Sequence, residues 1–136
     1  MHQEIVVTIA DFLRLKLMIR QTRRSWRLGT YLNALERELR RATLVRIEDL
    51  PRDIVTMNSR VRIRDAQRDL RDTVTIVYPH HADWDEGHVP VVAPLGTALL
   101  GMRVGDIAHH RGAWGIQAWE VEKVLYQPEA AGDHHL

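Results

Sequence analysis

The chain has 136 residues, of which 45% are hydrophobic and 27% charged, and it contains no cysteine. This composition is typical of one folded domain, with or without an appendage, and it excludes disulfides, thiolate metal ligands and cysteine nucleophiles. No apolar run approaches the ~20 residues that span a bilayer, and the N-terminus lacks the order of a signal peptide. We therefore expect a cytoplasmic protein that makes no contact with a membrane.

The net charge of +1 conceals two halves of opposite sign. Residues 1–50 contain ten Lys or Arg against six Asp or Glu, whereas residues 51–136 contain nine against twelve. A basic half followed by a mildly acidic half indicates two parts of the chain with different surfaces.

Two short helices are predicted in the basic half, over residues 1–48. The first begins after Thr8, because Thr8 and Asp11 have the spacing of a capping box. Its apolar residues recur at helical intervals and predict one apolar stripe. The residues of this stripe are Ile9, Phe12, Leu13 and Leu17.

The second helix is predicted to begin near Thr30, which is placed to act as its N-cap. Residues 21–28 form a polar, basic connection that suits two antiparallel helices. Helices of this length are marginal alone, so the hairpin must pack against the following domain or a second subunit. The apolar stripe of the second helix comprises Leu28, Tyr31, Leu32, Leu35 and Leu39, and the ion pairs expected on its wet face are Glu36–Arg40 and Glu38–Arg41.

From Pro51 onward the pattern becomes alternating. Residues 55–63 predict a strand with one wet face, on which Thr56 lies. The β-branched run at 73–78 predicts a second strand that pairs with the first as a hairpin. A polar loop is expected over residues 80–87.

Four further elements are predicted, which are a short strand at 89–92, a helix at 94–101 and strands at 104–110 and 116–126. Pro90 favours an edge position for the first of these strands, and Gly101 ends the helix. We expect the polar tail from Gln127 onward to be loose, with residues 131–136 outside the folded domain.

One phrase of the chain carries a family resemblance. Residues 93–101 read Ala-Pro-Leu-Gly-Thr-Ala-Leu-Leu-Gly, and residues 104–106 read Val-Gly-Asp. This resembles the C-terminal domain of the transcription elongation factors GreA and GreB, in which a Ser-Pro-Ile or similar triplet leads into a short helix ending in Leu-(Ile/Leu)-Gly. Phrases at 55–61, 77–79 and 126–133 are similar to short members of the family that regulate nucleoside diphosphate kinase.

The resemblance implies an α+β protein, in which an FKBP-like antiparallel-sheet domain over residues 50–130 follows the short helical hairpin. It also implies docking on RNA polymerase at the rim of the secondary channel, through Pro94, Leu95 and Gly96. For these three residues the structural alternative is a turn, because proline fixes the entry to a helix.

In Gre proteins a long helical hairpin enters the channel, and acidic residues at its tip help the polymerase bind a metal ion and cleave backtracked RNA. Here the arm is short, and residues 21–28 contain no acidic residue. Because Mg²⁺ prefers carboxylate oxygens, we expect no stimulation of RNA cleavage. The expected activity is competition with Gre factors for the same site.

A basic block lies between Arg14 and Arg27, with six positive residues and no acidic one. Its functional interpretation is a contact with the polymerase surface, or with nucleic acid near it, in which Trp26 strengthens the interface. The alternative is a solvated helix end with its cations near the C-terminal dipole. The contact candidates are Arg23, Arg24, Trp26 and Arg27.

No metal, cofactor, small-molecule substrate or catalytic residue is predicted. Six of the eight histidines form adjacent pairs, and neighbours on a strand point to opposite faces. Two other functions stay open, which are a protein-binding module that regulates nucleoside diphosphate kinase by another route, and a weak FKBP-like prolyl isomerase. Fold alone does not grant the latter activity. The side chains that could line an isomerase pocket are Trp84, Trp114 and Trp119.

Overall fold

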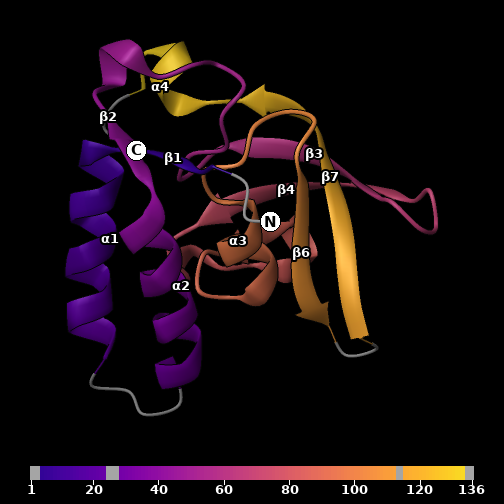
Figure 1. Cartoon of the computed structure of the whole chain (residues 1–136), viewed down its shortest axis with the longest axis horizontal. Helices are drawn as coiled ribbons and strands as arrows, with labels where there is room; N and C mark the ends of the chain where they lie inside the picture. Colours follow the sequence, from indigo (N-terminus) through magenta and orange to yellow (C-terminus); the bar gives the residue numbers. More distant parts are fainter. Residues whose placement is uncertain (1–3, 24–27, 113–114, 134–136) are drawn as a thin grey trace.

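The computed structural model describes residues 4–23, 28–112 and 115–133 (Figure 1). The helices are α1 (Ile9–Thr22), α2 (Gly29–Arg41), α3 (Pro94–Leu99) and α4 (Pro128–Ala131). The strands are β1 (Val6–Thr8), β2 (Thr43–Val45), β3 (Arg60–Asp65), β4 (Arg71–Val77), β5 (His88–Pro90), β6 (Ile107–Gly112) and β7 (Gly115–Tyr126). None of the helices described is long and apolar enough to cross a bilayer.

Five strands form one curled sheet in the order β5-β4-β3-β7-β6. All neighbours are antiparallel except β4 and β5, which run parallel. The pairing of β3 with β7 shifts register twice, and such irregularities bend a sheet. The helix α3 packs beside β6 (Figure 1). The predicted α+β class, with a helical pair followed by a mostly antiparallel sheet, is confirmed.

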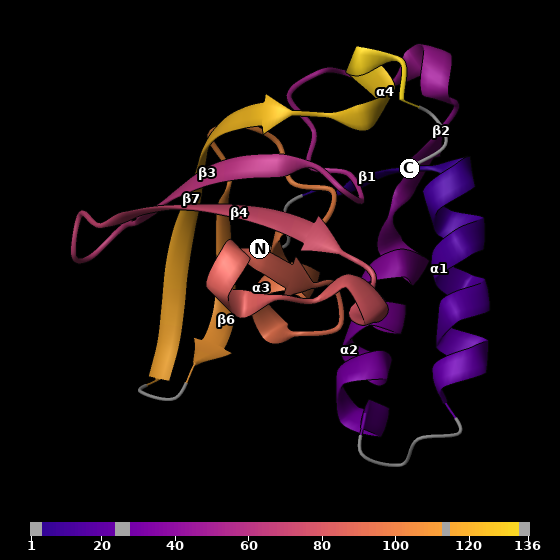
Figure 2. The same cartoon turned by 180° about the vertical axis from the view of Figure 1, so that it is seen from behind.

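The helical hairpin of α1 and α2 stands beside the sheet in both views (Figures 1 and 2). Its base contains a parallel pair of three-residue strands, β1 and β2, which the sequence pattern did not indicate. The amide of Val6 also donates to the carbonyl of Gly101, 3.0 Å away. The arm is therefore joined to the end of α3 by backbone as well as by side chains.

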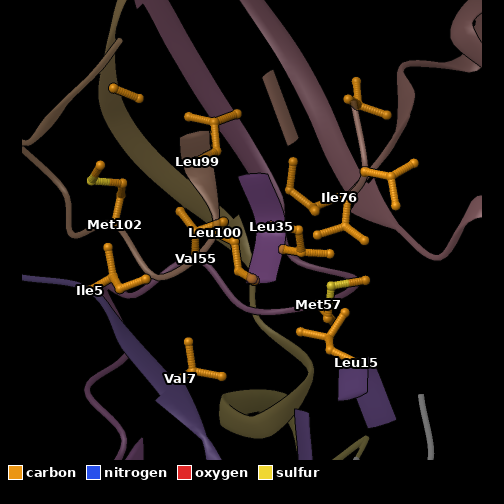
Figure 3. Close-up of a cluster of buried hydrophobic side chains, with 14 of the residues drawn as sticks. Ile5, Val7, Leu15, Leu35, Val55, Met57, Ile76, Leu99, Leu100 and Met102 are labelled. Atoms are coloured by element: carbon orange, nitrogen blue, oxygen red, sulfur yellow. The ribbon is translucent and has the colours of Figure 1, made fainter. Parts of the chain in front are cut away.

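A single apolar core joins the hairpin to the sheet. Leu15 and Leu35, from the two helices, are fully buried with Val55 and Ile76 from the sheet domain (Figure 3). Burial of such a side chain contributes about 1.5–3 kcal/mol. The hairpin is therefore docked against the following domain, as short helices require.

The predicted stripe of α1 was wrong. Ile9, Leu13 and Leu17 are exposed, with Leu13 at 61%, and Phe12 is only partly buried. The face that enters the core carries Leu15 and Ile19. Since apolar residues surround much of α1, periodicity alone could not select the buried face.

In α2 the predicted stripe is largely confirmed, because Leu32, Leu35 and Leu39 are buried. Tyr31, however, is exposed. The N-cap assignment was wrong, because Leu28 occupies the cap and Thr30 lies inside the helix. The two expected pairs, Glu36–Arg40 and Glu38–Arg41, are present.

The strand expected at 55–63 begins only at Arg60. Before it, the Ser59 hydroxyl accepts the Thr56 amide at 2.8 Å, and Asn58 has a positive φ of 65°. Thr56 is buried rather than on a wet face. The alternation of apolar and polar residues that predicted a strand here belongs to a hydrogen-bonded turn instead.

The tail is ordered further than expected. Gln127 is buried, and its side-chain amide donates to the carbonyls of Pro51 and Ile54 at 2.9 Å each. The helix α4 follows, and Asp133 accepts a hydrogen bond from the Tyr126 hydroxyl. Residues 127–133 therefore pack against the linker between hairpin and sheet.

Candidate functional site

The Pro-Leu-Gly entry to α3 is fixed by close backbone packing. A Cβ on Gly96 would lie 2.4 Å from the carbonyl oxygen of Pro90 and 2.9 Å from the Cα of Val91, so only glycine fits. The Thr97 hydroxyl donates to the carbonyl of Val91 at 2.7 Å. The helix is thereby held against the segment that follows β5.

This packing separates the three motif residues predicted as contacts. Gly96 is buried, Leu95 is half-buried and Pro94 is exposed. Gly96 therefore acts by permitting the close approach, whereas Pro94 is available to a partner. Pro94 lines two neighbouring hollows, one toward α2 and one toward the tip of β6.

The hollow toward the tip of β6 has a volume of about 320 Å³. Trp84, which is 61% exposed, and Trp119 lie on its lining together with His110 and Leu95. The indole Nε1 of Trp119 is buried and has no hydrogen-bond partner within the described residues. Burial lowers the pKa of His110, so its neutral form is favoured.

The basic candidates are only partly within the described residues. Arg23 binds Glu36 at 3.0 Å and the side-chain oxygen of Asn33 at 3.1 Å, so it ties α1 to α2. Glu36 also meets Lys16 at 3.8 Å and Arg40 at 3.3 Å. One carboxylate thus faces three cations, which leaves this side of the hairpin positive. Arg24, Trp26 and Arg27 lie outside the described residues.

A buried polar cluster that sequence reasoning missed joins the hairpin to the sheet. Asp11 is 1% exposed, and it accepts hydrogen bonds from the Met57 amide at 3.1 Å and from Arg14 at 2.9 Å. The Thr8 hydroxyl accepts from the Asp11 amide at 3.0 Å, as the predicted cap requires. Burial raises the pKa of Asp11 to about 6. The capping position was the only signal in the sequence, and it did not reveal the partner 46 residues away.

The histidines do not gather into a metal site within the described part of the chain, where no cluster of three His, Asp or Glu side chains could hold an ion. Asp106 acts as a turn residue, since its carboxylate accepts the Arg103 amide at 3.0 Å. The geometry offers surfaces for contact: an exposed proline, aromatic lining and cationic flanks.

A helical hairpin docked on a curled sheet, with a Pro-Leu-Gly helix entry, is the arrangement expected from the resemblance to transcription elongation factors. Residues 50–126, more than half of the chain, match the family described as "Transcription elongation factor, GreA/GreB, C-term". The chain therefore belongs to the GreA/GreB family, as the motif predicted.

Two curated proteins and one solved structure show which members of the family the chain is similar to. The "Regulator of nucleoside diphosphate kinase" of Escherichia coli (strain K12) is 44% identical over 105 residues, which cover 76% of this chain and 77% of that protein. GreA of Alkaliphilus oremlandii is 36% identical over 93 residues, which cover 68% of this chain and only 58% of that protein. Among solved structures, "Prokaryotic transcription elongation factor GreA/GreB from Nitrosomonas europaea" has a TM-score of 0.74 and 31% identity, and the match covers 90% of this chain and all of that one.

Proposed function

We propose that this protein binds RNA polymerase at the rim of the secondary channel and regulates elongation by competing with Gre factors. The observation that carries the proposal is the geometry of the family motif, in which Gly96 is buried to fix α3 while Pro94 stays exposed. A surface proline on a rigid helix entry can enter a partner's interface without a large ordering cost.

The short arm supports occupation of the channel mouth rather than catalysis within it. The helix α1 has 14 residues, which at about 1.5 Å per residue gives a length of about 21 Å. No acidic residue occurs between Gln21 and Leu28, and Arg23 lies at the end of α1. Guanidinium groups repel a Mg²⁺ ion that carboxylates would bind. We infer that the protein does not stimulate RNA cleavage and has no catalytic residues of its own.

The direct test is binding of the labelled protein to core polymerase, challenged with increasing GreA. Displacement by GreA is expected, since two proteins that share a site exclude each other by mass action. Pro94→Ala should weaken binding, whereas the control Pro79→Ala, also a proline that starts a short helix, should not. Binding that GreA leaves unchanged would rule out the shared site.

A second candidate function rests on the similarity to the Escherichia coli regulator of nucleoside diphosphate kinase. Under this alternative the chain is a module that binds another protein and controls that kinase. Purified kinase, assayed with and without the protein, distinguishes the two functions, because a polymerase-dependent regulator has no effect on the isolated enzyme.

The aromatic lining near Trp84 and Trp119 keeps a weak prolyl isomerase activity open to test. A peptide isomerisation assay decides it. The non-enzymatic proposal expects the uncatalysed rate.

A further inference from the structure

The strand β6 is an open edge of the five-stranded sheet. At the other edge lies β5, which has only three residues and ends at Pro90, and short strands with proline resist further pairing. By contrast, β6 has six residues and pairs on one side only, with β7, among the described strands. Every second residue of β6 therefore directs its backbone N–H and C=O away from the sheet.

A groove of about 600 Å³ runs along this edge. Three consecutive residues of β6, His109, His110 and Arg111, line it. Since consecutive side chains of a strand point to opposite faces, a hollow that touches all three follows the edge of the strand. In both views α3 lies between α2 and β6 (Figures 1 and 2), and Pro94, Thr97 and Ala98 of α3 line the groove.

The groove has an apolar bottom. Its lining includes Val92, Pro94 and Ala98 around α3, and Tyr31 and Ala34 on α2. An apolar side chain projecting from a guest strand would be removed from water here, at about 25 cal/mol per Å² of buried area.

The rim of the groove is positive. Arg37 from α2 and Arg111 from β6 form no ion pair within the described residues, whereas Glu38 is neutralised by Arg41. His109 adds a further donor on the same side. Acidic side chains on a guest would meet two uncompensated guanidinium groups, which favour bidentate contact with carboxylates.

One polar group beside the edge also lacks a partner. The indole nitrogen of Trp119 is buried and forms no hydrogen bond within the described residues. Such groups are usually satisfied, and a guest chain that supplies oxygen acceptors would satisfy the indole. His110 lines both hollows beside Pro94, so it stands where they adjoin.

We propose that the groove between α2 and β6 accepts an extended, acidic segment of a partner protein, which adds to the sheet as a strand next to β6. Backbone hydrogen bonds to β6 provide the binding energy common to every guest, and Arg37 and Arg111 select acidic residues. Alternate apolar side chains of the guest enter the hollow over Pro94 and Ala98. This surface shares Pro94 with the proposed polymerase contact, but its test needs no polymerase, because the proposal requires only an extended acidic segment.

The test uses the full chain and the synthetic peptide Glu-Val-Asp-Leu-Glu-Val-Asp, followed by amide chemical shifts and amide hydrogen exchange. Binding is expected with a Kd between about 10 μM and 1 mM, with slowed exchange at alternate residues of β6. Two versions of the peptide are N-methylated, one at odd and one at even positions. Because the amides of a strand alternate in direction, only one of the two should lose binding.

Charge is tested separately from the backbone. Arg37→Glu with Arg111→Glu should weaken binding by about tenfold or more, whereas Arg52→Glu, an exposed arginine outside the groove, should leave it unchanged. A peptide with lysine in place of each acidic residue should not bind. The proposal is overturned if the acidic peptide shows no shifts at 1 mM, if both methylated peptides bind equally well, or if the shifts fall away from β6 and α2.

Discussion

Replacing Asp11 by asparagine should remove a pH dependence from the stability of the protein. The pKa of Asp11 is about 6 in the folded chain, because burial disfavours its charge, against 3.8 for the unperturbed group. Glu129 raises this pKa further, while the Met57 amide and Arg14 oppose the rise. At about 1.4 kcal/mol for each pKa unit, the difference amounts to about 3 kcal/mol of unfolding free energy.

The sign follows from which state holds the proton. Below pH 3.8 both states are protonated and the stabilising contribution is fully present. Between pH 3.8 and about 6 the unfolded chain loses its proton first, so the free energy of unfolding falls as the pH rises. Above about pH 6 the folded chain is ionised as well, and the loss is complete.

The assay is urea unfolding of the wild type and Asp11→Asn from pH 4 to pH 8. Asparagine keeps an oxygen for the Met57 amide, so the variant should fold and lack this slope. The stability of the wild type relative to the variant should therefore fall by about 2.4 kcal/mol between pH 4 and pH 8, because the unfolded chain is already partly ionised at pH 4. Asp85→Asn, at an exposed position, serves as the control and should leave the slope unchanged. A wild-type minus Asp11→Asn difference that stays constant, or that rises with pH, would refute the argument.

Three further expectations concern the motif and the arm. Gly96→Ala should destabilise the protein by about 1–3 kcal/mol in thermal or urea unfolding, because its Cβ would meet the Pro90 carbonyl; unchanged stability would contradict this packing. Pro94→Ala should weaken polymerase binding in a pull-down with little change in melting temperature, and a fold-wide loss would instead indicate a structural role. Replacing Arg23, Arg24 and Arg27 together by alanine should weaken polymerase binding and flatten its salt dependence; equal affinity at low salt would exclude a contact.

The sequence predicted elements whose signals are local. Gly101 ends α3 with a φ of 81°, which a non-glycine residue rarely adopts, and the last two predicted strands pair antiparallel as β6 and β7. The face of α1 was not predictable, because its choice depends on a core contributed by distant segments. The Met57 amide that donates to Asp11 lies 46 residues further along the chain, so the sequence around Asp11 could not predict this hydrogen bond.

The candidate site was predictable only where a motif stands in one stretch of sequence. Pro94, Leu95 and Gly96 were found in this way, although their separate roles depend on the approach of Val91. The groove along β6 was not found, since it requires α2 and β6, which are far apart in sequence, to lie on either side of α3. The hydrophobic periodicity of the sequence predicts single helices and strands, but it does not predict which strand lies at the edge of the sheet.

The buried amide of Gln127 gives the C-terminal segment an influence over the direction of the arm. It holds the carbonyls of Pro51 and Ile54, and Glu129 accepts from the Thr56 hydroxyl at 2.7 Å in the same region. The two carbonyls and the Thr56 hydroxyl belong to the segment that connects the helical hairpin to β3. Truncation after Tyr126 would leave the buried carbonyl of Ile54 and the partly buried carbonyl of Pro51 without the Gln127 donor, and the buried group alone would cost about 1–3 kcal/mol. The direction in which the arm leaves the sheet is thus fixed in part by residues 127–129, which follow the last strand of the sheet.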